Sequence, residues 1–150
     1  MKNKREIINQ MSMEFVSRSV NESFARAAVS AFAAQLDPTL EEINDIKTSV
    51  SEAVTNCIVH GYPDKIGLIK IKVRLYDDGL MDIVVRDKGA GIADIAEARR
   101  PLFTTGGAER SGMGFTIMES FMDSLRVRSV IGKGTTVTMS RRILPRLSAK

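Results

Sequence analysis

Three short segments of this 150-residue chain carry residue types that bind metals, polar groups and anions. In the first, Glu52 and Asn56 are four residues apart, so on a helix both side chains lie on the same side and can face one ligand. Mg²⁺ prefers such oxygen ligands and completes its octahedron with waters and phosphate oxygens. An ordinary solvated helix face would carry the same pair, so this spacing alone leaves both interpretations open.

The second segment is Asp87, Gly89 and Gly91, directly after a run of β-forming residues. Glycines at alternate positions let the backbone bend sharply and approach a flat ligand without a Cβ in the way. An Asp at such a place can accept a hydrogen bond from an exocyclic amine. A glycine-containing turn with a surface Asp is the alternative explanation.

In the third segment, Gly112 and Gly114 lie at the start of a predicted helix. The unpaired N–H groups and the dipole of a helix N-terminus favour an anion such as a polyphosphate, whereas a flexible loop end would also use glycines. Arg110 could contact a terminal phosphate or be solvated. Each segment alone is a weak signal, but their joint order makes nucleotide binding our leading hypothesis.

Two further residues could suggest chemistry. His60 is the only histidine, and we expect it to have a structural role at a helix end or to contact residues that bind the ligand. Cys57 lies among apolar positions and is expected to be a small core residue. The single cysteine also excludes an intramolecular disulfide.

Length and composition predict one domain over residues 1–150, because 43% hydrophobic content supplies one substantial core and the chain is short for two. We expect loose tails over residues 1–11 and 143–150. No apolar run is long enough to cross a bilayer, and residues 1–10 lack the apolar core of a secretory signal. The sequence therefore predicts a cytoplasmic protein.

The net charge of +4 lies partly at the two ends of the chain. A nucleic-acid-binding protein normally shows a basic stripe on an ordered face, with aromatic residues for stacking. This chain has no Trp and its aromatic residues are scattered. We therefore expect no direct binding of nucleic acid.

Periodicity and capping signals predict the helices. One helix runs from about Glu22 to Leu36, with Ser19 or Asn21 as its cap. A second begins after Thr39, with Glu42 three residues on as its capping-box partner, and continues to about residue 60. This second helix has an apolar side and a polar side. The apolar positions are Ile43, Ile46, Val50, Ala53, Val54, Cys57 and Ile58, and the polar ones are Asp45, Ser49, Glu52, Asn56 and His60.

Alternating apolar residues predict the strands. Residues 13–17 form a short strand, residues 68–76 and 81–86 a first hairpin, and residues 125–131 and 135–139 a second. Between the hairpins, residues 92–112 read as a short helix followed by a mobile loop, and residues 113–121 as another helix.

Four segments together resemble the gyrase, Hsp90, histidine-kinase and MutL (GHKL) ATPase superfamily. They are residues 52–56, 87–91 and 112–114 and the pair Gly134-Thr135. The resemblance covers roughly residues 48–137, and the Gly-Lys-Ser/Thr ending of a Walker phosphate loop is absent. Within the superfamily, residues 21–26, 51–56, 101–105 and 109–119 are similar to the sporulation anti-sigma factors that act as serine kinases by partner switching.

The resemblance implies an α/β fold, a two-layer sandwich with helices on one face of a mixed, mostly antiparallel sheet, known as the Bergerat-type ATP-binding fold. It implies that ATP or ADP lies between the helices and a lid of residues 104–114. Asn56 would bind Mg²⁺, Asp87 would bind the adenine amine, and Thr135 would support the base. Gly89 and Gly91 would line the base pocket. The lid residues implied to contact the nucleotide are Thr104, Thr105, Arg110, Ser111, Gly112, Met113 and Gly114.

The resemblance also implies a reaction and partners. Glu52 would be the general base that takes the proton from an attacking serine hydroxyl. The partners would be a sigma factor, held by a homodimer with Arg26 as a contact, and an anti-anti-sigma protein that is phosphorylated. Two alternatives stay open: an ATP-gated binding module without phosphate transfer, and a detached ATP-binding domain of a histidine kinase. The position of His60 beside Asn56 argues against the second.

Overall fold

The structure is a computed structural model that describes residues 4–100 and 113–144. Its strands are β1 Ile7–Val16, β2 Leu68–Tyr76, β3 Leu80–Asp87, β4 Ser124–Val130 and β5 Gly134–Arg142. Its helices are α1 Asn21–Ala33, α2 Leu40–Asn56, α3 Ile95–Ala98 and α4 Gly114–Phe121, with a 3₁₀ turn, η1 Ala34–Leu36, and a π turn, η2 Cys57–Gly61.

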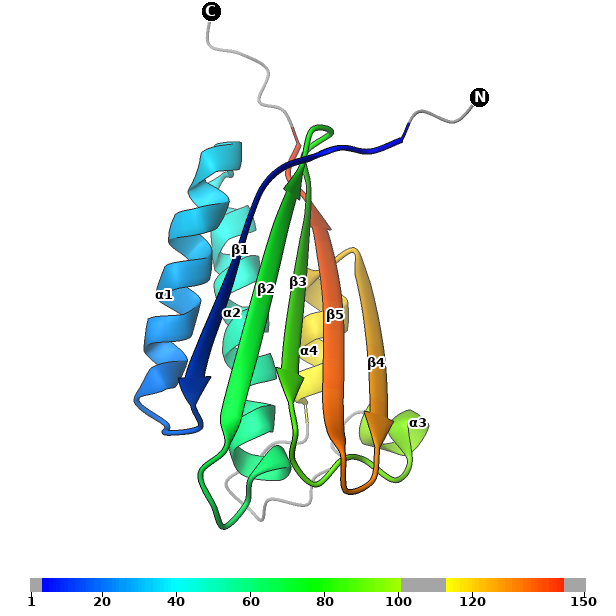
Figure 1. Cartoon of the computed structure of the whole chain (residues 1–150). Helices are drawn as coiled ribbons and strands as arrows, with labels where there is room; N and C mark the ends of the chain where they lie inside the picture. The colour runs from blue at the N-terminus through cyan, green and yellow to red at the C-terminus, as the bar shows by residue number, and fades with distance from the viewer. Residues whose placement is uncertain (1–3, 101–112, 145–150) are drawn as a thin grey trace, which may run out of the picture.

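The strands form one sheet in the order β1-β2-β3-β5-β4. Helices α1, α2 and α4 cover one face of this sheet, and no element of the described residues covers the other, which we call the open face (Figure 1). The predicted two-layer α/β fold is confirmed. All pairings among the described strands are antiparallel, so the sheet there is not mixed. Both predicted hairpins are present, β2–β3 and β4–β5.

The core lies between the sheet and the helices because each strand alternates apolar and polar residues. In β2, Ile69, Ile71, Val73 and Leu75 are fully buried, while the residues between them point away from the helices. From α2, Ile46, Val50 and Val54 complete this core. The apolar side predicted for α2 is therefore confirmed.

The first strand is longer than predicted. It begins at Ile7 and pairs with β2 from Ile7 opposite Tyr76 to Val16 opposite Leu68, with one register shift between Ile7 and Asn9. Residues 7–11 therefore belong to the sheet and not to a loose tail. The sequence did not reveal this because Ile7 and Ile8 are 46% and 58% exposed, so no buried alternation marks them. At the other end, Ile143 is buried and is also not part of a tail.

The two long helices begin differently. Thr39 and Glu42 form the predicted capping box at α2: the Glu42 N–H donates to the Thr39 hydroxyl, and Glu42 Oε1 accepts from the Thr39 N–H at 2.8 Å. At α1 the prediction is wrong, because Val20 occupies the N-cap and no side chain caps the helix. The amide of Asn21 instead donates to the carbonyl of Val16, which ties α1 to the end of β1.

Two residues of the predicted polar side of α2 are not available to a site. Ser49 is fully buried, and Asp45 makes an ion pair of 2.9 Å with Arg141 of β5. Only Glu52, Asn56 and His60, nearer the C-terminal end, are left to border a site. Within the described residues, no helix is both long and apolar enough to cross a membrane.

Candidate functional site

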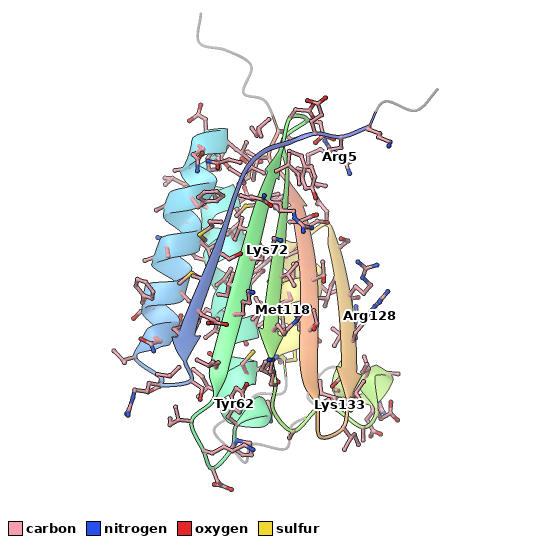
Figure 2. All side chains as sticks on the ribbon, in the orientation of Figure 1. Arg5, Tyr62, Lys72, Met118, Arg128 and Lys133 are labelled. Atoms are coloured by element: carbon pink, nitrogen blue, oxygen red, sulfur yellow. The ribbon has the colours of Figure 1, made fainter. Side chains whose placement is uncertain are left out.

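The end of α2 widens into a π turn. The N–H of Tyr62 donates to the carbonyl of Cys57 five residues earlier, at 2.9 Å. Such turns are rare within helices and are frequently found at functional sites. The Tyr62 ring then anchors the turn, because its hydroxyl donates to the Leu68 carbonyl and accepts from the Lys88 N–H at 2.6 Å. Figure 2 labels Tyr62 at this lower end of the molecule.

A cavity of about 410 Å³ lies between this turn, the sheet and the start of α4. Its lining is mainly apolar with a few polar groups, the composition typical of a small-molecule site. The sheet contributes Val85, Asp87, Thr135 and Val137; α2 and η2 contribute Ala53, Asn56, Cys57, His60 and Gly61; α4 contributes Gly114 and Phe115. The remaining lining residues, from the segment around α3, are Gly91, Ile92, Ala93, Asp94, Glu97 and Ala98.

Asp87 is the buried acid of this cavity, only 5% exposed. Its Oδ1 accepts from the N–H groups of Gly89 at 2.9 Å and Thr135 at 3.3 Å. These two donors fix the carboxylate in place. A Cβ on Gly61 would lie 2.9 Å from Asp87 Oδ2, so a glycine at 61 leaves the space that this oxygen occupies.

Cys57 is buried, as predicted, and it also lines the cavity beside Asp87. Burial raises the pKa of its thiol well above the usual value, and the charge of Asp87 and a hydrogen bond to it raise the pKa further. The thiol is therefore protonated at neutral pH and contributes a small neutral wall to the site.

The glycines after Asp87 are required by close packing. A Cβ on Gly89 would lie 2.0 Å from the carbonyl oxygen of Gly61, and that oxygen accepts from the N–H of Ala90. Gly91 has a φ of +78°, and a Cβ there would lie 2.4 Å from the carbonyl oxygen of Val130. Of the two glycines, only Gly91 lines the cavity, whereas Gly89 packs the strand end against η2.

Glu52 and Asn56 meet the first residue of α4. A Cβ on Gly114 would lie 3.1 Å from Asn56 Nδ2, 3.2 Å from Asn56 Oδ1 and 3.3 Å from Glu52 Oε1, so both side chains end beside the first residue of α4. Mg²⁺ in nucleotide sites takes one or two protein oxygens and completes its shell with phosphates and water. The pair fits such an ion, and the described residues hold no cluster of three acidic, His or Cys side chains that would form a cage of protein ligands.

The structure brings most of the predicted site residues together. Asn56, Asp87, Gly91, Gly114 and Thr135 line the cavity, Glu52 and Gly89 adjoin it, and Met113 is the N-cap of α4. Thr104, Thr105, Arg110, Ser111 and Gly112, the greater part of the predicted lid, lie outside the described residues. Arg26 does not line the cavity; it is exposed on α1 and lies 3.5 Å from Glu22.

Several lining residues were not predicted. The sequence does not mark Gly61 or Phe115 as site residues. Gly61 has no side-chain functional group, and Phe115 is an apolar residue of the kind expected in the core. Helical spacing could have identified Ala53, because it lies three residues before Asn56 on α2 and such residues are neighbours on a helix surface. Asp94 caps α3 through the N–H of Glu97, and both acids lie in the cavity lining.

Comparisons with known proteins agree with this geometry. Residues 16–141 match the family model described as the histidine kinase-like ATPase domain, a type of domain that implies ATP binding. The anti-sigma F factor of Thermoanaerobacter sp. (strain X514) is 59% identical over 139 residues, which are 92% of this chain and 96% of that protein. That of Geobacillus kaustophilus is 58% identical over 137 residues, 90% of this chain and 93% of that protein.

Among solved structures, the RsbU and RsbW domains of Rv1364c from Mycobacterium tuberculosis share the fold. The TM-score is 0.66 at 21% identity, over 90% of this chain and 32% of that one. Fold and cavity thus define an ATP-binding domain of the histidine kinase type. Within that class, the chain belongs to the family of the anti-sigma F factors.

Proposed function

We propose that this protein is an ATP-dependent switch. It binds and inhibits a sporulation sigma factor, and it uses Mg-ATP to phosphorylate a serine on an anti-anti-sigma antagonist. The observation that carries the proposal is the convergence of Glu52 and Asn56 on the N-terminus of α4, next to a cavity that contains Asp87. The identity to anti-sigma F factors over nearly their whole length supports the same function.

In this proposal ATP extends through the cavity from Asp87 to Gly114. The fixed carboxylate of Asp87 accepts a hydrogen bond from the adenine amine, with Thr135 and Gly91 around the base. The phosphates lie at the N-terminus of α4, where the N–H groups of the first turn and the helix dipole stabilise negative charge. Asn56 would hold Mg²⁺ through its side-chain oxygen, and the bound ion would neutralise phosphate charge.

Glu52 is the proposed general base. Its carboxylate accepts the proton of the attacking serine hydroxyl as the serine oxygen bonds to the γ-phosphorus. The bond from that phosphorus to the β–γ bridging oxygen breaks, and ADP leaves with the electron pair. A positioned base contributes about 10²–10⁴-fold to such a step. Glu52 Oε1 faces the end of α4 at which we place the phosphates, which suits this role.

Partner choice would follow the nucleotide. We propose a homodimer in which exposed Arg26 of α1 contacts the sigma factor. Any ligand that binds the ATP form more tightly than the ADP form shifts the equilibrium by that difference in affinity. ATP would favour the complex with the sigma factor, and phosphorylation of the antagonist would end its competition.

A second candidate is an ATP-gated binding module that transfers no phosphate. It is favoured by one observation: Glu52 adjoins the cavity but does not line it. The two candidates differ in what Glu52→Gln does. A base is needed for transfer and not for ATP binding, so the kinase loses transfer at least about 100-fold while its ATP affinity is unchanged.

The decisive experiment is a pull-down of partners from sporulating cells with and without Mg-ATP, followed by mass spectrometry for phosphoserine. We expect a sigma factor in the ATP sample and an acid-stable phosphoserine on a second partner. For the Glu52→Gln variant, Glu41→Gln is the matched control, because Glu41 is exposed at the opposite end of the same helix. Absence of phosphate on every captured partner would favour the ATP-gated binding module. An acid-labile phosphate would indicate phosphorylation of a histidine instead.

A further inference from the structure

The open face of the sheet is strongly basic. The residues that alternate with the buried ones on β2, β3 and β4 point away from the helices, and many of them are cations. They are Lys70, Lys72, Arg74, Arg86, Arg126 and Arg128, with Lys88 and Lys133 at the lower end of the same face. Figure 2 looks onto this face, with Lys72, Arg128 and Lys133 labelled. From the sequence we placed the excess charge partly at the chain ends and expected no binding of nucleic acid; these cations on an ordered surface remove one reason for that expectation.

Acidic residues lie beside the cations at the upper end of the face and, at the lower end, beside Lys70. At the upper end, Asp78 pairs with Arg5 at 2.8 Å and with Arg142 at 3.3 Å, and Asp82 lies opposite Arg74. In the middle and at the lower end of the face, several cations have no ion pair within the described residues: Lys72, Arg86, Lys88, Arg126, Arg128 and Lys133. The density of unpaired positive charge on the face is therefore greater at its lower end than at its upper end.

Two of the cations are placed at a cost to the fold. Lys70 lies directly opposite Arg86 in the β2–β3 ladder, and like charges directly opposite each other destabilise a sheet. Glu14, opposite Lys70 on β1, offsets part of this repulsion. Arg86 has no such neighbour on its other side, where it is paired with Thr136. An external anion would stabilise this arrangement.

The lower end is also hollowed. A depression of about 310 Å³ is lined by the four cations Arg86, Lys88, Arg128 and Lys133, together with Ser129 and Thr136. It lies across the sheet from the nucleotide cavity, with Asp87 and Thr135 in the lining of both. Cations and hydroxyls in one depression are the groups that contact phosphate oxygens of nucleic acids.

We infer that the lower part of the open sheet face binds the sugar–phosphate backbone of double-stranded nucleic acid without regard to sequence. Alternate residues of a strand are about 7 Å apart and neighbouring strands about 4.8 Å, so the cations form a grid that an extended polyanion can follow. A second copy of this chain is disfavoured there, because two such faces would repel each other.

The composition of the face separates a duplex from other anions. Single-stranded nucleic acid needs exposed aromatic side chains for stacking. On the described part of this face, the aromatic residue is Tyr76 at the upper end, and it lies under Arg5. A protein partner normally meets an apolar or aromatic centre, and cations and hydroxyls occupy the centre here instead. The backbone of a duplex requires neither feature.

Fluorescence anisotropy with a labelled mixed-sequence DNA duplex of roughly 20 base pairs tests this inference. If about five phosphates are neutralised, affinity falls about 500-fold between 50 mM and 200 mM salt. The double variant Arg128→Gln/Lys133→Gln should weaken binding at least about tenfold at 50 mM and reduce the salt slope by about 1.8. The matched control is Arg18→Gln/Lys47→Gln, which removes two exposed charges from residues outside the β2–β5 face.

We expect the control variant to bind within about twofold of the unmodified protein, with thermal melting showing that both variants are folded. Equal weakening by the two double variants would overturn the inference, because net charge and not this face would then be responsible. Tighter binding of single-stranded DNA would overturn the choice of a duplex. Tighter binding of polyglutamate than of the duplex would indicate an acidic protein instead.

Discussion

Gly61 and Asp87 are adjacent in the folded protein although they are 26 positions apart in the sequence: a Cβ at position 61 would lie 2.9 Å from Asp87 Oδ2. The π turn at the end of α2 therefore leaves room for a buried carboxylate at the end of β3. Backbone N–H groups of Gly89 and Thr135 hold the other oxygen. The cavity thus contains a charge whose position is fixed before any ligand binds.

Asp87→Asn tests what this fixed charge does. The amide oxygen can still accept from Gly89 and Thr135, so the fold should melt within a few degrees of the unmodified protein. A hydrogen bond to a charged group contributes about 1.5–3 kcal/mol, so ATP affinity should fall about 10- to 150-fold. Calorimetric titration with ATP measures this. Unchanged affinity would mean that Asp87 is structural and does not bind the base.

Gly89→Ala should destabilise the fold more than a glycine substitution at a turn. Its Cβ would lie 2.0 Å from the Gly61 carbonyl oxygen, so backbone must move, and overpacking of this kind costs about 2–3 kcal/mol. The control is Gly132→Ala, which has open space but a φ of +77° and should cost only about 1 kcal/mol. Urea unfolding compares the two. An equal loss of stability in the two variants would show that η2 moves to accommodate the added methyl group at little cost.

The thiol of Cys57 should react slowly in the native protein. Burial and Asp87 raise its pKa, and since the thiolate is the reactive form, alkylation by iodoacetamide at neutral pH should be far slower than in urea. The native rate should rise with pH beyond the range in which the unfolded thiol has already titrated. ATP should slow it further, because Cys57 lines the cavity. Mass spectrometry of timed samples follows the reaction, and a rate independent of ATP would place the nucleotide elsewhere.

The Asp78 cluster should contribute stability that acid removes. Hydrogen bonding to Arg5 lowers the pKa of Asp78 to about 2, and bonds to the Leu80 N–H and to Arg142 act in the same direction. A lowered pKa stabilises the fold above the ordinary carboxyl pKa, and this contribution is lost as the pH falls from there through about 2.

The stability difference between the unmodified protein and Asp78→Asn should therefore be constant above about pH 5 and shrink towards acid. It should remain small at all pH values, since exposed ion pairs contribute little. Urea unfolding at a series of pH values measures it. Asp64→Asn is the control, because Asp64 is exposed and makes no ion pair within the described residues. A difference that grows in acid would contradict the assignment.

Elements with local signals could be predicted from the sequence. The capping box of Thr39 and Glu42 and the 3.6-residue period identified α2, and alternation with turn residues identified both hairpins. The first ten residues could not be assigned in this way. β1 begins at Ile7 only because β2 offers its edge, and that pairing joins residues far apart in sequence.

The sequence by itself determined the chemical groups of the site, because Glu52, Asn56, Asp87 and the glycines at 91 and 114 lie in short patterns that local structure preserves. Only the tertiary structure decided that Gly61 adjoins Asp87 and that cations of three strands share one open face. Helix and strand periods fix which side of its own element a residue occupies. The register between strands and the packing of helices on the sheet decide which sides meet, and these depend on contacts between distant parts of the chain.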